Sequence, residues 1–226
     1  MELATSSRIR RGHEEASPLA ISATFPVRLR ALVLWGRRRS EDGMKQIILT
    51  ALLFLIATLP ANADVKVEES STYFNLQGLT SREIHQDLMR NAPREGGEII
   101  EGEVADHFSV DFQSRMDGQE CRAFDERVTL KLKIQLPKWV DEKRAASAVR
   151  VSWNQYMDKL LAHENRHKEI AISAAHAVHD IIHTASIKGS CEGLDAKIRR
   201  AAKRTISESE RRQQAWDENA EQFGIE

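Results

Sequence analysis

The chain has 226 residues, with 33 basic and 34 acidic side chains and a formal net charge of −1 at pH 7. Residues 1–63 hold nine of the basic and five of the acidic side chains, which leaves 24 basic and 29 acidic side chains, a net charge of −5, for the rest. This balance excludes a strongly basic nucleic-acid-binding protein, because such proteins carry a positive excess that neutralises phosphates. We therefore expect no nucleic-acid partner.

An apolar segment, residues 47–59, has the features of a secretory signal peptide. It follows Met44 and a lysine and ends in Ala-Asn-Ala, so a positive residue, a short apolar run and an A-x-A cleavage site come in order. The run is too short for a convincing membrane span. We predict a signal peptide at 44–63 that is cleaved after Ala63, a periplasmic or secreted protein, and no stable membrane span after cleavage.

The signal peptide divides the chain into two parts. Residues 1–43 are rich in arginine and lack a hydrophobic period. Because a signal peptide belongs at an N-terminus, we interpret them as a mis-called extension, with translation starting at Met44; a disordered basic tail and an unusually long n-region are the alternatives. Residues 64–226 have the length of one domain.

The predicted domain opens with a strand and a helix. A β-like run at 72–76 ends near Gly78. Thr80 and Glu83 then have the spacing of a capping box for a helix that ends at Pro93.

Two longer strands follow. One alternates apolar and polar residues over 108–112, and the other does so more clearly over 128–136. Asp117 and Gly118 predict a turn between them, which favours an antiparallel pair. His107 falls with the polar set of its strand, so we expect it to face solvent.

Two helices complete the predicted fold. Pro137 ends the second strand, and a long helix is predicted from about 142 to 187, with Asp141 as its cap and Gly189 at its end. A last helix is predicted over about 194–221. The sequence thus predicts an α+β domain, in which a small antiparallel sheet packs against a long helix and a C-terminal helix.

The long helix carries the motif H-E-x-x-H at His163, Glu164 and His167. Positions i and i+4 of a helix lie on one face, so the two imidazoles can hold one metal ion while Glu164 reaches a metal-bound water. Both histidines stand in the apolar stripe of the helix, where core residues are expected. Because two histidines at ligand spacing flank a glutamate, we predict a zinc site, with Glu164 as general base, rather than two core histidines.

A catalytic zinc site needs three protein ligands and an open position, and the motif supplies two. Ser173 stands where the metzincin arrangement would place a third histidine. The candidates are carboxylates of the following helix, Asp217, Glu192 and Asp195, and spacing does not choose among them.

Three further histidines, His176, His179 and His183, lie on the same helix. At 100° per residue they point roughly away from the motif. We expect surface histidines; the alternative is a second, weaker metal site.

The two cysteines, Cys121 and Cys191, both lie in the part predicted to be exported. Oxidising compartments favour disulfides, and only one internal pairing exists. We predict this disulfide, which would tie the segment after the motif helix to the strands; two free thiols are the alternative.

Several short stretches together give the chain a family resemblance. They are Tyr73–Thr80, Leu-Pro-Lys-Trp at 136–139, Trp153, the H-E-x-x-H motif, Cys121 with Cys191, and Trp216-Asp217. The chain resembles a bacterial family of predicted secreted zinc-dependent proteases, domain of unknown function 922. One departure concerns the end of the chain: the family has His-Gly after a Tyr-Asp pair and a threonine, and this chain has Gln222 and Phe223 there.

The resemblance implies a secreted or periplasmic zinc metallopeptidase that hydrolyses a peptide or amide bond of a peptide or protein substrate. By analogy with zincins, a strand edge beside the motif helix would hold an extended peptide. The first alternative is a catalytically inactive envelope binding protein, stabilised by its disulfide, with a vestigial or structural metal site. The second is a hydrolase of an amide outside protein, such as cell-wall peptide.

Overall fold

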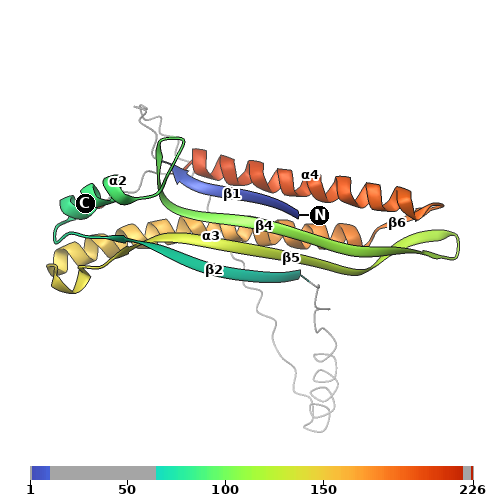
Figure 1. Ribbon diagram of the computed structural model, residues 1–226, viewed down its shortest axis with the longest axis horizontal. Helices are drawn as coiled ribbons and strands as arrows, with labels where there is room; N and C mark the ends of the chain where they lie inside the picture. The colour runs from blue at the N-terminus through green and yellow to red at the C-terminus, as the bar shows by residue number, and fades with distance from the viewer. Residues whose placement is uncertain (1, 11–64, 221–224, 226) are drawn as a thin grey trace, which may run out of the picture. The chain divides into compact units, whose positions relative to one another are not determined.

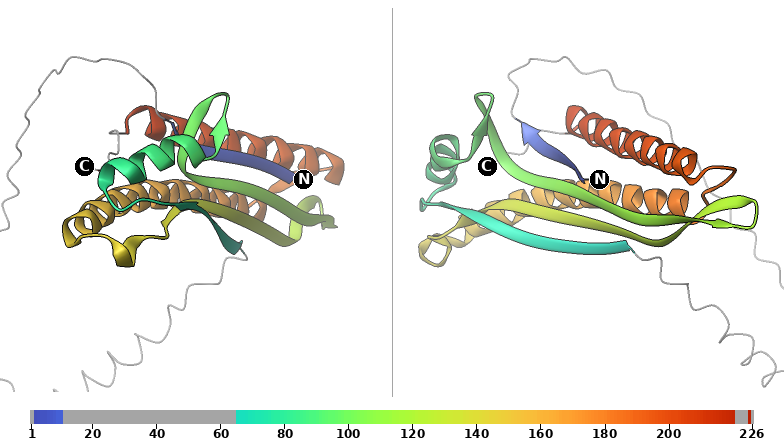
Figure 2. Two further views of the ribbon diagram at one scale, coloured as in Figure 1. Left: turned by 60° about the vertical axis from the view of Figure 1, so that its left-hand side comes forward. Right: turned by 45° about the vertical axis from the view of Figure 1, so that its right-hand side comes forward.

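The structure, a computed structural model, describes residues 2–10, 65–220 and 225. These residues form an α+β fold, as predicted, in which a sheet packs against two long helices (Figures 1 and 2). The main sheet has the strand order β1 (Glu2–Arg10), β4 (Glu98–Asp117), β5 (Glu120–Trp139), β2 (Val65–Leu76). Two short strands join it, β3 (Arg94–Glu95) beside β4 and β6 (Ser186–Lys188) beside β5.

Strands β4 and β5 form the predicted antiparallel hairpin, but both are longer than predicted, and Pro137 lies within β5 instead of ending it. The turn lies at the predicted position, and Gly118 adopts a φ of 64°, which a residue without Cβ tolerates best. The two strands pair in register, with Phe108 opposite Leu130 and Val110 opposite Val128, so their buried side chains share one face. That face is the sheet's side of the core.

Strand β2 differs from the prediction in length and direction. It begins at residue 65 rather than 72 and runs parallel to β5, so the sheet is mixed rather than wholly antiparallel. Most side chains between 65 and 71 are exposed. The early part therefore pairs mainly through its backbone. The sequence alternates apolar and polar residues only from Val65 to Glu68, and the polar run at 69–71 ends that pattern.

Residues 2–10 form the edge strand β1, which pairs antiparallel with β4 from Glu2 opposite Ser109 to Arg10 opposite Ile100. This differs from the expectation that residues 1–43 lie outside the domain. Backbone N–H and C=O groups along this edge of β4 accept another strand with little regard to its sequence, and β1 pairs with them. The predicted signal peptide at 44–63 lies outside the described residues and stays a prediction.

The helices begin and end close to the predicted positions, with two corrections. Helix α2 (Ser81–Asn91) has the predicted capping box between Thr80 and Glu83. The long helix α3 (Ser147–His183) is preceded by a 3₁₀ turn, η1 (Glu142–Arg144), and Asp141 does not cap it. The Asp141 carboxylate instead accepts the backbone N–H of Gly78 at 3.1 Å.

The second correction concerns the end of α3. The helix stops at His183 rather than near 187, because residues 186–188 form β6 and pair with residues 120–122. Helix α4 (Cys191–Glu218) follows, with the Ser190 side chain at its N-cap. The predicted disulfide between Cys121 and Cys191 is confirmed and fixes this end of α4 to β5.

Among the described residues, no helix combines the length and apolar character that crossing a membrane requires.

Candidate metal centre

Helices α3 and α4 bring three potential metal ligands together. His163 and His167 lie one turn apart on α3, and Asp217 lies in the last turn of α4. The Oδ1 atom of Asp217 is 3.0 Å from His163 Nε2 and 2.8 Å from His167 Nε2, and the two Nε2 atoms are 2.8 Å apart. Of the sequence candidates for a third ligand, the structure places Asp217 with the histidines.

These three atoms form a nearly equilateral triangle, which a shared cation satisfies better than hydrogen bonds do. Each neutral imidazole can donate one proton from Nε2. If both imidazoles donated to the same carboxylate oxygen, two N–H donors would lie side by side with no acceptor between them. Two ligands of a tetrahedral zinc ion at bond lengths of about 2.0–2.1 Å lie about 3.3 Å apart. Small outward shifts of the three side chains would admit a metal ion, so this group could hold one.

The end of α4 is fixed to the sheet by a buried hydrogen bond. The Gln213 side-chain amide donates to Oδ2 of Asp106 on β4 at 2.9 Å, and both side chains are buried. Gln213 lies one turn before Asp217, so this bond ties the part of α4 next to Asp217 to β4. Trp216 stacks on the ring of His163, with 5.5 Å between the ring centroids.

The charge of Asp217 suits a ligand. Burial raises the pKa of this carboxyl, but the hydrogen bonds from His163 and His167 outweigh burial and hold the pKa below its ordinary value. Asp217 therefore stays an anion at neutral pH, ready to meet a cation.

Glu164 is buried beside the three ligands, and its side chain is 2 % exposed. Within the part of the chain that the structure describes, neither of its carboxylate oxygens has a hydrogen bond. Burial raises the pKa of Glu164 well above its ordinary value, and the negative charges of Asp217 and Glu103 raise it further. A buried carboxyl with no hydrogen bond is costly, which marks it as a group held for chemistry or for a positive ligand.

Gly102 on β4 lies directly against this carboxyl. A Cβ atom at position 102 would lie 2.7 Å from Oε1 of Glu164 and 2.9 Å from Cδ1 of Leu160. Both distances are below any normal contact, so glycine is what allows the strand to approach α3 here.

The remaining predicted candidates lie elsewhere. Glu192 is exposed in the first turn of α4, at the opposite end of that helix from Asp217. Asp195 accepts a hydrogen bond from the Ser114 hydroxyl at 2.6 Å. His107, half-buried in β4, is not among the grouped ligands. Gln222 and Phe223 lie outside the described residues.

The three other histidines of α3 are not all on the surface. His176 and His183 are exposed, as expected, but His179 is buried and stacks on His183, with 5.7 Å between the ring centroids. The expectation of surface histidines is wrong for His179, because α3 is covered on more than one side. His183 Nδ1 lies 2.7 Å from a carboxylate oxygen of Glu126, and the hydrogen bond between the two side chains lowers the pKa of Glu126.

Reasoning from sequence missed the residues of the sheet that complete the site: Gly102, Glu103, Asp106 and, on α4, Gln213. A signal existed only for Asp106, a carboxylate in a buried position of an alternating strand. The others have no motif, because their roles depend on packing between distant segments.

Comparisons with known proteins give one match. The model of a family described as bacterial protein of unknown function (DUF922) matches residues 71–224. This span contains the three grouped ligands, Glu164 and both cysteines. No curated protein and no solved structure matches significantly.

Proposed function

Because the chain belongs to the family of bacterial proteins of unknown function DUF922, and this membership assigns no activity, we propose its function from the site itself. We propose a periplasmic or secreted zinc-dependent metallopeptidase that hydrolyses a peptide or amide bond. The observation that carries the proposal is the convergence of His163, His167 and Asp217 beside the buried carboxyl of Glu164, which has no hydrogen-bond partner among the described residues.

Three residues would bind the metal ion, and a fourth would transfer protons. His163, His167 and Asp217 would hold the ion, two through imidazole Nε2 and one through Oδ1. A bound zinc ion supplies a Lewis acid that polarises the scissile carbonyl and makes water nucleophilic near neutral pH. Glu164 takes the proton of the attacking water and delivers it to the leaving amine.

The sheet offers a place for the substrate. Strand β4, whose Gly102 touches Glu164, accepts an extended antiparallel segment on its outer edge, and residues 2–10 lie there. The pairing has an irregularity between Arg8 and Arg10, opposite the part of β4 that carries Gly102. A peptide substrate that replaces residues 2–10 on this edge would place its backbone near the proposed general base.

The disulfide supports the proposed location. Disulfides persist in oxidising compartments, and Cys121 and Cys191 are paired. With the predicted signal peptide at 44–63, this favours export of the protein to the periplasm or beyond.

Metal content tests the proposal directly. The purified full chain should contain about one zinc ion per molecule, measured by inductively coupled plasma mass spectrometry. His163→Ala and Asp217→Ala should lose most of it, and the matched control Glu192→Ala should keep it. Equal zinc in the wild type and in His163→Ala would refute the site.

A second reading, an inactive binding protein with a structural metal, has its own support. His163 and Glu164 are only 3 % and 2 % exposed, and His167 is fully buried, so the site is closed as structural sites are. Glu164→Gln separates the two functions. If the protein is a peptidase, the wild type cleaves casein, and the variant keeps its zinc but no longer cleaves casein. If the metal is structural, the variant also keeps its zinc, but the wild type does not cleave casein.

A further inference from the structure

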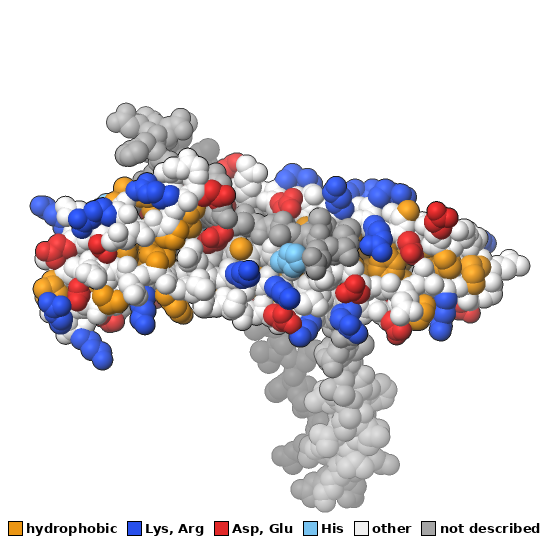
Figure 3. All heavy atoms as spheres, viewed as in Figure 1, with side chains coloured by type: hydrophobic (Ala, Val, Ile, Leu, Met, Phe, Trp, Pro, Cys, Tyr) orange, Lys and Arg blue, Asp and Glu red, His pale blue; other side chains and the backbone are white. Residues whose placement is uncertain are grey.

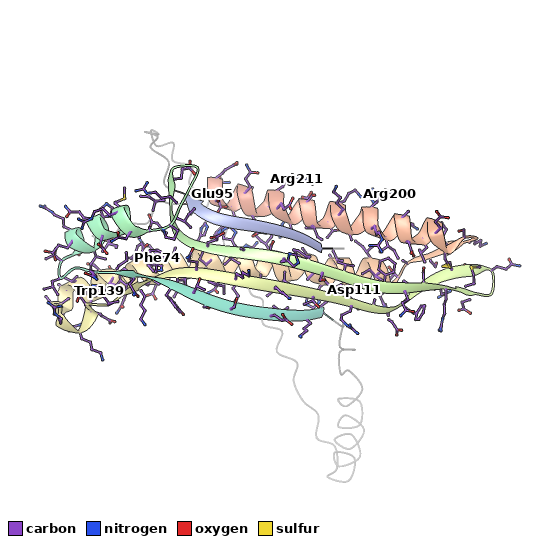
Figure 4. The ribbon with its side chains drawn as sticks, in the orientation of Figure 1. Phe74, Glu95, Asp111, Trp139, Arg200 and Arg211 are labelled. Atoms are coloured by element: carbon purple, nitrogen blue, oxygen red, sulfur yellow. A yellow bond between two sulfur atoms is a disulfide. The ribbon has the colours of Figure 1, made fainter. Side chains whose placement is uncertain are left out.

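A groove of about 690 Å³ lies between α3 and α4, outside the candidate metal centre. Its floor includes the small side chains of Ala174 and Ala177 from α3. Its rim carries five basic side chains of α4: Arg200, Lys203, Arg204, Arg211 and Arg212. Lys and Arg side chains gather along α4 on the molecular surface, and Arg200 and Arg211 mark two points of the rim (Figures 3 and 4).

The positive charge of the rim is largely uncompensated. Among the described residues, Arg211 has an acidic partner, Glu208, which is also the only carboxylate that lines the groove. Arg200, Lys203, Arg204 and Arg212 are exposed and make no ion pair within that part of the chain.

The spacing makes this arrangement unfavourable without a ligand. Arg200 lies three residues before Lys203 and four before Arg204, so these like charges are neighbours on the helix surface and repel each other. The part of the chain after residue 63 has a net charge of −5, so the rim is a local exception to an acidic protein. An anion that bridges the rim removes the repulsion.

The shape and chemistry of the groove select among anions. Four of the five cations are arginines, whose planar guanidinium groups bind carboxylates through two parallel hydrogen bonds. The α3 side of the groove includes the small apolar side chains of Ala174 and Ala177. We propose that the groove docks an acidic polypeptide segment, with its carboxylates on the arginine rim and its apolar side chains on the alanine floor.

This site would act beside the metal centre and does not depend on it. Arg212 precedes Asp217 by little more than one turn of α4, so a docked segment would lead toward the candidate ligands. The docking would hold for a substrate or for a partner, since the groove contains none of the proposed metal ligands.

The test measures binding of a defined probe to the full chain. The probe is a fluorescein-labelled ten-residue peptide of alternating glutamate and alanine, and its control has glutamine in place of glutamate. Fluorescence anisotropy should show binding of the glutamate peptide that weakens with added salt. Arg200→Glu combined with Arg204→Glu should weaken it at least tenfold, while Arg82→Glu with Lys143→Glu, the same charge change at exposed sites elsewhere, should change it less than twofold.

Three results would overturn the proposal. In the first, the glutamine peptide binds as well as the glutamate peptide. In the second, the groove variant has a native circular dichroism spectrum and binds the glutamate peptide as the wild type does. In the third, the wild type binds phosphatidylglycerol vesicles but not the peptide, and the groove variant does not bind the vesicles. The measurement is repeated in EDTA and with Glu164→Gln. Binding that persists there supports the groove even if the metal centre fails its own test.

Discussion

Gly102→Ala is the sharpest test of how the sheet meets the motif helix. The added methyl would lie 2.7 Å from Glu164 Oε1 and 2.9 Å from Leu160 Cδ1, and both side chains are buried. Relieving two such overlaps requires shifts of β4 or of packed side chains, and overpacking of this kind costs about 1–3 kcal/mol. Gly193→Ala is the matched control, because its Cβ would meet only Ile187 Cδ1 at 3.7 Å.

Urea denaturation of the metal-free protein, followed by circular dichroism, measures both changes. Gly193 lies in α4, so alanine there should stabilise the protein by about 0.5 kcal/mol. Gly102→Ala should destabilise it, and should cost less in a Glu164→Ala background, because the removed carboxyl leaves room for the methyl. Gly102→Ala as stable as wild type, or an equal cost in both backgrounds, would refute the contact between β4 and Glu164.

Other predictions concern the disulfide, the buried carboxyl and the sheet. Reducing the bond between Cys121 and Cys191, which spans 70 residues, should lower the free energy of unfolding by up to about 4 kcal/mol, measured by urea titration with and without dithiothreitol. The folded-state pKa of Glu164 is raised, so the metal-free wild type should lose stability as pH rises above 4.5, whereas Glu164→Gln should not. Melting temperatures of the two proteins in EDTA measure this. A constant difference between them from pH 4 to 8 would contradict the prediction. Tyr156→Phe should cost about 1.5–3 kcal/mol by urea titration, because the Tyr156 hydroxyl donates to the buried Glu101 carboxylate at 2.9 Å.

The fold was predictable where its signals are local. The capping box at Thr80, the turn at Gly118 and the alternation of β5 each depend on residues a few positions apart, and each stands where it was predicted. Strand β1 and the early part of β2, which form edges of the sheet, were not predicted, because backbone pairing at a sheet edge needs no side-chain pattern. The long helix was predicted to extend further at both ends. At its start the 3₁₀ turn η1 forms through local bonds, with the Arg144 N–H donating to the Asp141 carbonyl at 2.9 Å. At its end β6 forms by pairing with the distant residues 120–122.

In the candidate site, too, only the residues with a local signal were predictable. The helical repeat alone places His163 and His167 on one face of α3, so the sequence predicted both. Gly102 and Gln213 act through contacts between β4 and the two helices, and no spacing rule reveals them.

The position of the third candidate ligand follows from the length of the return path between the two helices. The midpoint of His163 and His167 lies about 18 residues before the end of α3, which is about 27 Å of helix. Strand β6 then carries the chain about 10 Å further before α4 starts at Cys191. Returning over about 37 Å takes about 25 helical residues, which reaches the level of Asp217 and leaves Glu192 at the far end. β6, which the sequence did not predict, therefore decides which carboxylate of α4 meets the two histidines.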